Sequence, residues 1–301
     1  MKLGSLLILL TLIFTACREK DDMKHIFKII EDISITSNIT YKTVDTLELQ
    51  LDVYYPAKKL GEDPWDEISN QKKPTLVYFH GGGWVSGDRT SRFLALLPYL
   101  AKGWCVVNVD YRLLQETNLI GSLNDCIDAI NWVTDNASNY KFDTNNLYLS
   151  GESAGGHLAL LAGMIKEPEG SGEIHKREGE VRGIINWYGI TEMESAIEFW
   201  NDTDYEQLIL EKSTEEREQY LELTSPISHV STKNTPSIFS VHGNEDINVQ
   251  IEQAISFHGE LQKHGIKNKL LEIDGKKHGN FNTTELEMIY KAIWKFFEID
   301  R

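Results

Sequence analysis

The pattern of apolar and polar residues changes repeatedly along the chain. Residues 47–55 (LELQLDVYY) alternate apolar and polar side chains, which is the period of a half-buried strand. Shorter apolar runs predict buried strands at 76–79, 105–109, 147–149, 184–187, 238–241 and 270–273. Helical spacing between them predicts helices at 92–102, 122–136, 154–165, 249–264 and 284–298. This alternation predicts an α/β fold, a mainly parallel twisted sheet flanked by helices.

The alternation is continuous and therefore predicts one domain over residues 39–301. Residues 191–222 interrupt it, because this stretch is polar, charged and helix-prone. We interpret it as a small helical cap over the site. The alternative is a pair of surface helices with no role there.

The N-terminal segment has the features of an export signal. Met1 and Lys2 come before an apolar run, 6–14, that is interrupted only by Thr11. The whole stretch 3–16 is too short for a membrane span of about 20 residues. Thr-Ala-Cys at 15–17 resembles a bacterial lipobox, which implies a signal peptide over 1–16 and lipidation of Cys17. Residues 17–38 would then be a tether. The lipid alone would hold the protein in the bacterial cell envelope, in the periplasm or on the surface. The alternative is ordinary secretion with an incidental cysteine.

Charge and cysteine content exclude several classes of protein. The chain has 30 Lys and Arg against 46 Asp and Glu, a net charge of −16, which argues against nucleic-acid binding and electrostatic docking on anionic lipid. With only three cysteines, no disulfide framework holds the fold. Cys105 and Cys126 are expected to be free, although the sequence leaves a bond between them open. It does not reveal the oligomeric state.

The segment 151–155 (GESAG) carries the first candidate chemistry. It is a G-x-S-x-G motif between a predicted strand and a predicted helix, the context of a nucleophile elbow. Ser153 would lie on the sharp turn, and the helix N-terminus would face it, which favours developing negative charge. The alternative is a plain turn of small residues.

Residues 80–84 (HGGGW) follow the strand predicted at 76–79. Consecutive glycines leave backbone N–H groups unobstructed. Together with the N–H of Ala154, such donors can form an oxyanion hole. We expect His80 to hold the loop in place.

Two further motifs also follow predicted strands. Asp246 lies in VHGNED at 241–246, and His278 lies in GKKHG at 275–279. A serine needs a base to take its proton, and the base needs a carboxylate to orient it. Glu245 competes for the acid role, but we favour Asp246. No cluster of His, Cys or carboxylate residues has the spacing of a metal site.

These motifs, in this order, resemble the α/β-hydrolase superfamily. The resemblance covers about residues 51–294 and is strongest to carboxylesterases of the hormone-sensitive-lipase type and the BD-FAE (feruloyl/acetyl esterase) type. It implies Ser153 as nucleophile, His278 as base and Asp246 as its partner, with no cofactor. It also implies Gly82, Gly83 and Ala154 as oxyanion donors and Gly81 as a turn residue.

The resemblance implies hydrolysis of a small ester or an acylated glycan, with short acyl groups such as acetyl or feruloyl. Trp84, Trp187 and Tyr188 are candidates for the substrate pocket, with core packing as the alternative. One rival is an amide hydrolase, either arylformamidase-like or a peptidase. A rival of another class is an inactive binding module.

Overall fold

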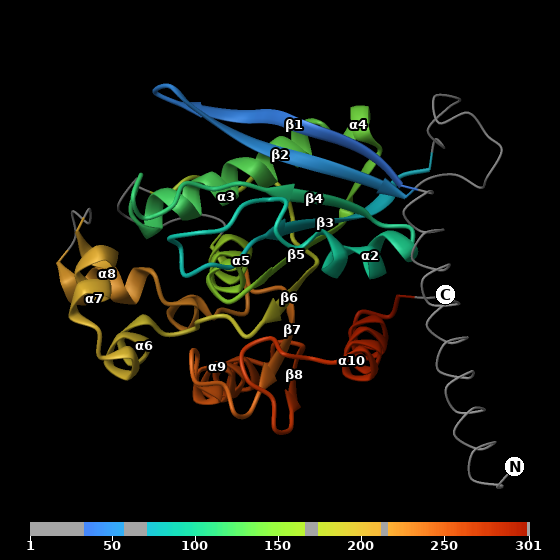
Figure 1. Ribbon diagram of the computed structural model, residues 1–301. Helices are drawn as coiled ribbons and strands as arrows, with labels where there is room; N and C mark the ends of the chain where they lie inside the picture. The colour runs from blue at the N-terminus through green and yellow to red at the C-terminus, as the bar shows by residue number, and fades with distance from the viewer. Residues whose placement is uncertain (1–32, 57–70, 166–173, 212–215, 300–301) are drawn as a thin grey trace, which may run out of the picture.

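The computed structural model describes residues 33–56, 71–165, 174–211 and 216–299. Its centre is a single eight-stranded sheet with the strand order β1-β2-β4-β3-β5-β6-β7-β8 (Figure 1). The strands are β1 (Ile33–Val44), β2 (Leu47–Pro56), β3 (Lys73–Phe79), β4 (Cys105–Val109), β5 (Phe142–Glu152), β6 (Gly183–Trp187), β7 (Ser237–Gly243) and β8 (Asn268–Ile273).

The sheet is mixed and mostly parallel. The hairpin β1–β2 is antiparallel, and β2 pairs with β4 antiparallel. From β4 through β3 to β8, every neighbouring pair is parallel. The loops after β3, β5, β6, β7 and β8 therefore leave the same edge of the sheet, the edge at which open α/β sheets hold their sites. The predicted α/β fold with a mainly parallel sheet is confirmed.

Helices cover both faces of the sheet. One face packs against α2 (Phe93–Ala101) and α10 (Thr283–Phe296), and the other against α3 (Leu119–Asp135), α5 (Ala154–Met164) and α9 (Ile251–Lys263). Side chains of β3 alternate between the two cores. Leu76 faces α2 and α10, whereas Val77 faces α3 and α5. This explains the continuous apolar run, because both faces of the strand are buried.

The remaining helices lie outside these two layers. Helix α4 (Ala137–Tyr140) is a single turn before β5. Three helices occupy the region expected to form the cap, namely α6 (Met193–Trp200), α7 (Thr203–Leu210) and α8 (Arg217–Leu223). They group together at one end of the molecule (gold in Figure 1). A 3₁₀ turn, Pro226–His229, leads back towards β7.

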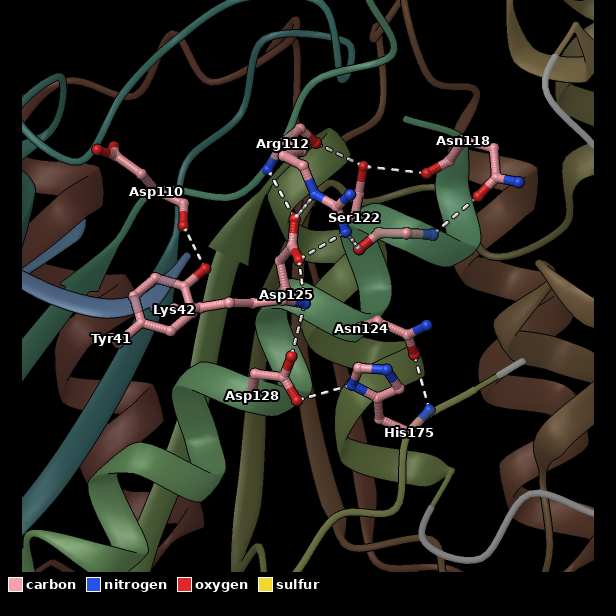
Figure 2. Close-up of polar contacts among 11 residues, drawn as sticks. Tyr41, Lys42, Asp110, Arg112, Asn118, Ser122, Asn124, Asp125, Asp128 and His175 are labelled. Atoms are coloured by element: carbon pink, nitrogen blue, oxygen red, sulfur yellow. Dashed lines mark hydrogen bonds and ion pairs between the residues drawn. The ribbon is translucent and has the colours of Figure 1, made fainter. Parts of the chain in front are cut away.

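Strand β1 begins before residue 38, where the sequence placed the end of the tether. Residues 33–38 begin β1 rather than a linker, because they pair with β2 from Ile33 opposite Pro56 onward. A buried ionic cluster fastens this hairpin to α3 (Figure 2). Lys42 on β1 lies 2.7 Å from Asp125, whose side chain is fully buried and also receives Arg112 at 2.7 Å. Lys42 also lies 2.6 Å from Asp128, so two cations pair with two carboxylates, and the buried Asp125 is paired as burial of a charge requires.

The segment 1–32 lies outside the described residues. It contains the expected signal peptide, Cys17 and most of the expected tether. Within the part of the chain that the structure describes, no helix is both long and apolar enough to cross a bilayer.

Candidate active site

Ser153 lies on a sharp turn between β5 and α5. Its φ is 52° and its ψ is −120°, a left-handed backbone conformation that costs energy for a residue with a Cβ. The strain is maintained by close packing of strand and helix. A Cβ on Gly155 would lie 2.1 Å from the carbonyl oxygen of Phe79, so only glycine fits there. The small residues of the motif are therefore required by the turn.

The backbone around Ser153 is fixed from both sides. Its N–H donates to the carbonyl of Trp187 at 2.9 Å, and its carbonyl accepts the N–H of His157 at 3.0 Å. Ala154 follows as the first residue of α5. The positive end of this helix therefore begins next to the serine hydroxyl.

The glycine loop after β3 has two carbonyls held by hydrogen bonds from within the loop. The Nδ1–H of His80 donates to the carbonyl of Gly81 at 2.8 Å. The carbonyl of Gly82 accepts the N–H of Val85 and of Ser86, each at 3.1 Å. In a trans peptide the N–H points away from the C=O, so these bonds fix the directions of the Gly82 and Gly83 N–H groups.

His80 has the holding role expected from the sequence. Besides its bond to Gly81, its ring stacks on Tyr111 with the centroids 4.3 Å apart. The Tyr111 hydroxyl donates to the His80 carbonyl at 2.7 Å. Burial lowers the pKa of His80, only partly opposed by the bond to Gly81. The ring is therefore neutral near pH 7 and donates through Nδ1.

Asp246 and His278 come together from separate loops. Nδ1 of His278 lies 2.6 Å from Oδ2 of Asp246, and the Asp246 side chain is fully buried. The other carboxylate oxygen accepts the backbone N–H groups of Asn248 and Val249 at 2.8 and 3.0 Å. Glu245, the competing acid, is exposed to solvent.

The carboxylate of Asp246 is held in its ionised form. Burial alone would raise its pKa. Hydrogen bonds from His242 and His278 and from two backbone N–H groups outweigh burial and keep the pKa well below its usual range. His242 is fully buried; its Nε2 donates to the carbonyl of Val249 at 2.8 Å and also lies 3.4 Å from Oδ2 of Asp246. A second histidine therefore helps to hold the acid.

One pocket of about 600 Å³ brings these groups together. Its lining includes Gly81, Gly82, Gly83, Ser153 and His278 from the expected motifs. Glu152 of the serine motif also lines it, without having been assigned a role. The lining further includes residues outside the motifs: Arg92, Ile190, Phe199, Trp200, Asp202, Tyr205, Ile247, Asn248 and Val249. Ser153 and His278 thus share a solvent-accessible space.

Of the three aromatic pocket candidates, the structure places only Tyr188 in the pocket lining. Trp84 is fully buried beneath the glycine loop, against His157. Trp187 faces the opposite core, against Tyr290 on α10. The expectation for these two tryptophans is therefore wrong. Sequence gives the position of an aromatic residue along a strand but not the face to which it points.

Tyr188 contacts both His278 and Glu152 in the pocket wall. Its ring meets that of His278 edge-on with centroids 4.6 Å apart, and its hydroxyl donates to Glu152 at 2.8 Å. Glu152 is also ion-paired with Arg92. Burial, followed by the charge of Glu152, raises the pKa of Tyr188 well above 10, so the hydroxyl stays protonated and donates. The pocket wall beside His278 is therefore polar, and the negative charge of Glu152 in it is balanced by Arg92.

The family model BD-FAE matches residues 51–261, more than half of the chain. The chain belongs to the BD-FAE family. The observed sheet has the α/β-hydrolase fold. The match spans the glycine loop, the serine turn and Asp246 and ends before His278.

Several known proteins are similar to this chain. Esterase LipC of Mycobacterium tuberculosis is 30% identical over 234 residues, covering 73% of this chain and 58% of the relative. A bifunctional GH43-CE protein of Bacteroides eggerthii is 26% identical with a TM-score of 0.72, covering 89% of this chain and 38% of that one. Esterase B of Lactobacillus rhamnosus has the same fold at 18% identity, with a TM-score of 0.74 over 98% of this chain and 95% of that one. The chain spans about half the length of the curated relatives it matches.

Two other expectations concern metals and thiols. Among the described residues of this BD-FAE protein, no group of three His, Cys, Asp or Glu side chains could hold a metal ion. Cys105 and Cys126 are both buried and free, which settles the bond that the sequence left open. Burial raises the pKa of the Cys105 thiol to about 12, so this thiol is unreactive near neutral pH.

Proposed function

We propose that this chain is a serine carboxylic-ester hydrolase that works through an acyl-enzyme on Ser153. One observation carries the proposal. Ser153 and His278 line the same pocket, and Asp246 holds the Nδ1 side of the His278 ring at 2.6 Å. The Nε2 side is then the one available to a serine hydroxyl, as a nucleophile–base–acid arrangement requires.

The chemistry has two halves. In the first, Ser153 attacks the ester carbonyl while His278 takes the hydroxyl proton, and His278 then gives that proton to the leaving alcohol. In the second, His278 takes a proton from water as the water attacks the acyl-enzyme, and it then returns that proton to the Ser153 oxygen as the acyl–oxygen bond breaks and the acid product leaves. The ionised Asp246 stabilises the imidazolium that forms in both halves.

The glycine loop and the start of α5 would stabilise the charge on the tetrahedral intermediate. The N–H groups of Gly82, Gly83 and Ala154 are the proposed donors to the oxyanion. Fixed donors in a shielded site act without reorganisation at the moment of reaction, and one such donor is typically worth about 100–1000-fold in rate.

For the substrate, we propose short acyl esters, such as acetyl or feruloyl groups, on carbohydrates. The BD-FAE family and the likeness to the GH43-CE protein support this choice. The pocket also has aromatic rings beside polar groups, with Trp200 and Tyr205 near Asp202 and Asn248. Such a lining suits a sugar, which presents apolar faces and hydroxyl edges.

The test is hydrolysis of a substrate panel by the wild type, Ser153→Ala and Ser138→Ala. The panel holds p-nitrophenyl acetate, butyrate and octanoate, acetylated xylan, methyl ferulate and N-formylkynurenine. We expect turnover of acetate and acetylated xylan that Ser153→Ala abolishes. Ser138 is exposed on α4, and its substitution should change nothing. Faster turnover of the formamide would instead indicate an amide hydrolase, and no turnover by the wild type would indicate a binding module.

We also propose that a lipid on Cys17 anchors the enzyme in the bacterial cell envelope. The support is the apolar run that ends in Thr-Ala-Cys. Metabolic labelling with a fatty-acid analogue in a bacterial host tests it. The wild type should be labelled and Cys17→Ser should not; equal labelling of both would contradict the anchor.

A further inference from the structure

A hydrogen bond connects the cap to the glycine loop. The hydroxyl of Tyr205, on α7, donates to the carbonyl of Gly83 at 2.7 Å across 122 residues of sequence. Burial raises the pKa of Tyr205 above its usual value of 10, and Asp202 raises it further, so the hydroxyl keeps its proton. A Cβ on Gly83 would lie 2.9 Å from this oxygen, so the contact is close.

With this bond, the carbonyls of all three glycines in the loop accept hydrogen bonds. The carbonyls of Gly81 and Gly82 are held from within the loop, by His80 and by Val85 and Ser86. The carbonyl of Gly83 is held from outside it. Gly83 has a φ of 61°, and a glycine there has wide freedom to rotate. The cap therefore supplies the restraint at the point where the loop itself gives none.

Helix α7 is well placed to position Tyr205. Asp202 caps the helix, and its Oδ1 accepts the backbone N–H of Asp204 at 3.2 Å and that of Tyr205 at 3.1 Å. The Tyr205 ring packs on the fully buried Trp84 with the centroids 6.4 Å apart. Backbone and ring are thus both fixed before the hydroxyl reaches Gly83.

A second bond connects the cap to the loop of the acid. Nε1 of Trp200, at the end of α6, donates to the carbonyl of Asn248 at 2.7 Å. The N–H of Asn248 donates in turn to Asp246 at 2.8 Å. The rings of Trp200 and Tyr205 meet edge-on at 5.3 Å. One aromatic pair therefore joins the two loops on either side of the pocket.

We propose that Tyr205 is a positioning residue: it holds the peptide between Gly83 and Trp84, which limits the rotation of Gly83 and so keeps the Gly82 and Gly83 N–H groups in the geometry that receives the oxyanion. Trp200 in the same way holds the peptide between Asn248 and Val249, whose N–H donates to Asp246 at 3.0 Å. The proposal rests on the proposed esterase function. It gives the cap a role in catalysis beyond covering the pocket. A group that acts on geometry should affect kcat, because the oxyanion exists only in the reacting state.

The test compares Tyr205→Phe with Tyr41→Phe in the full chain. The Tyr41 hydroxyl donates to the Asp110 carbonyl, also at 2.7 Å, on the side of the molecule drawn in Figure 2. Both variants lose one hydroxyl-to-carbonyl bond and keep the ring. We expect Tyr205→Phe to lower kcat on p-nitrophenyl acetate by about 10- to 100-fold with KM within twofold. Tyr41→Phe should keep the wild-type kcat.

Inhibitor binding and melting temperatures distinguish a positioning role of Tyr205 from a role in stability or in substrate contact. A trifluoromethyl ketone forms an oxyanion adduct with an active serine, so its Ki should rise for Tyr205→Phe in parallel with the loss in kcat. Trp200→Phe should also lower kcat. The melting temperatures of Tyr205→Phe and Tyr41→Phe should fall by similar amounts.

Two results would overturn the proposal. One is a kcat of Tyr205→Phe within twofold of the wild type. The other is a loss confined to KM, which would make Tyr205 a substrate contact only. Either result can be interpreted only if the wild type is active and the Ser153→Ala variant is inactive. An inactive wild type would instead contradict the esterase function itself.

Discussion

Nδ1 of His278 lies 2.6 Å from Oδ2 of Asp246, although their loops follow different strands and the residues are 32 positions apart. Strands β7 and β8 are parallel neighbours, so both loops leave the same edge of the sheet. Two backbone N–H groups hold the other carboxylate oxygen. The pair is therefore fixed before any substrate arrives, and His278 lines the pocket that Ser153 also lines.

This pair predicts that substitution of Asp246 lowers kcat far more than substitution of the neighbouring Glu245. Asp246→Asn keeps the shape but removes the charge. Because two backbone N–H groups need the amide oxygen, the NH2 group would face Nδ1 in place of an acceptor, so kcat should fall on the order of 10³- to 10⁴-fold. Glu245→Gln, one residue away and exposed, should stay within twofold of the wild type. Steady-state kinetics on p-nitrophenyl acetate measure both. A larger loss for Glu245→Gln would assign the acid role to Glu245.

The bond from His80 to the glycine loop predicts a second loss in kcat. His80→Ala frees the Gly81 carbonyl and with it the Gly82 N–H, so kcat should fall by about 10- to 100-fold with little change in KM. His258→Ala is the control. This histidine is also buried, but it binds Asn268 at the start of β8, the opposite end of the strand from the loop that carries His278. If both variants kept the wild-type kcat, the loop would not depend on His80.

The close approach of β3 and α5 predicts which glycine cannot be replaced. Gly155→Ala would place a methyl group 2.1 Å from the Phe79 carbonyl, so it should lower the free energy of unfolding by about 3 kcal/mol or more. Gly259→Ala, in α9 with no atom within 4 Å of the added group, should raise it by about 0.5–1 kcal/mol. Urea titration of both variants gives the values. A stable Gly155→Ala variant would contradict the packing.

A buried histidine predicts how stability depends on pH. Burial lowers the pKa of His157 from 6.5 to about 4, opposed by its bond to the Thr224 carbonyl and assisted by His229. The unfolded chain therefore binds this proton first as the pH falls. The free energy of unfolding should rise from pH 4 to pH 6.5, with about 3 kcal/mol from this group.

The variant His157→Gln isolates that contribution. Glutamine keeps an N–H donor for Thr224 but does not titrate. The difference in unfolding free energy between wild type and variant should therefore grow with pH across this window and become constant above it. Two parallel curves would show that His157 is not held neutral in the folded state.

Much of the site was predictable because its residues follow recognisable strands. A buried parallel strand is a short apolar run, and the residues after it, such as Ser153 or Asp246, must lie at the carboxyl edge of the sheet. The glycine turn was predictable for the same reason, since Gly155 marks a close approach. These inferences need only local sequence and the rule that parallel strands share an edge.

The remaining features depend on contacts between distant segments. Strand β1 has mostly exposed side chains, so no apolar run marks it, and its place comes from pairing with β2. The cap residues Trp200 and Tyr205 carry no motif, because their role lies in bonds to the two loops. The error over Trp84 and Trp187 has the same origin, since the direction of a side chain is decided by tertiary packing.

The most direct test of the central claim is to trap the covalent intermediate. The protein is treated with paraoxon, which phosphorylates an activated serine, and the modified peptide is identified by mass spectrometry. Asp246→Asn serves as the variant with an intact serine and a weakened base. The account predicts one adduct per chain, on Ser153, formed far more slowly in Asp246→Asn and absent in Ser153→Ala. An adduct on another residue, or ester hydrolysis that persists in Ser153→Ala, would contradict it.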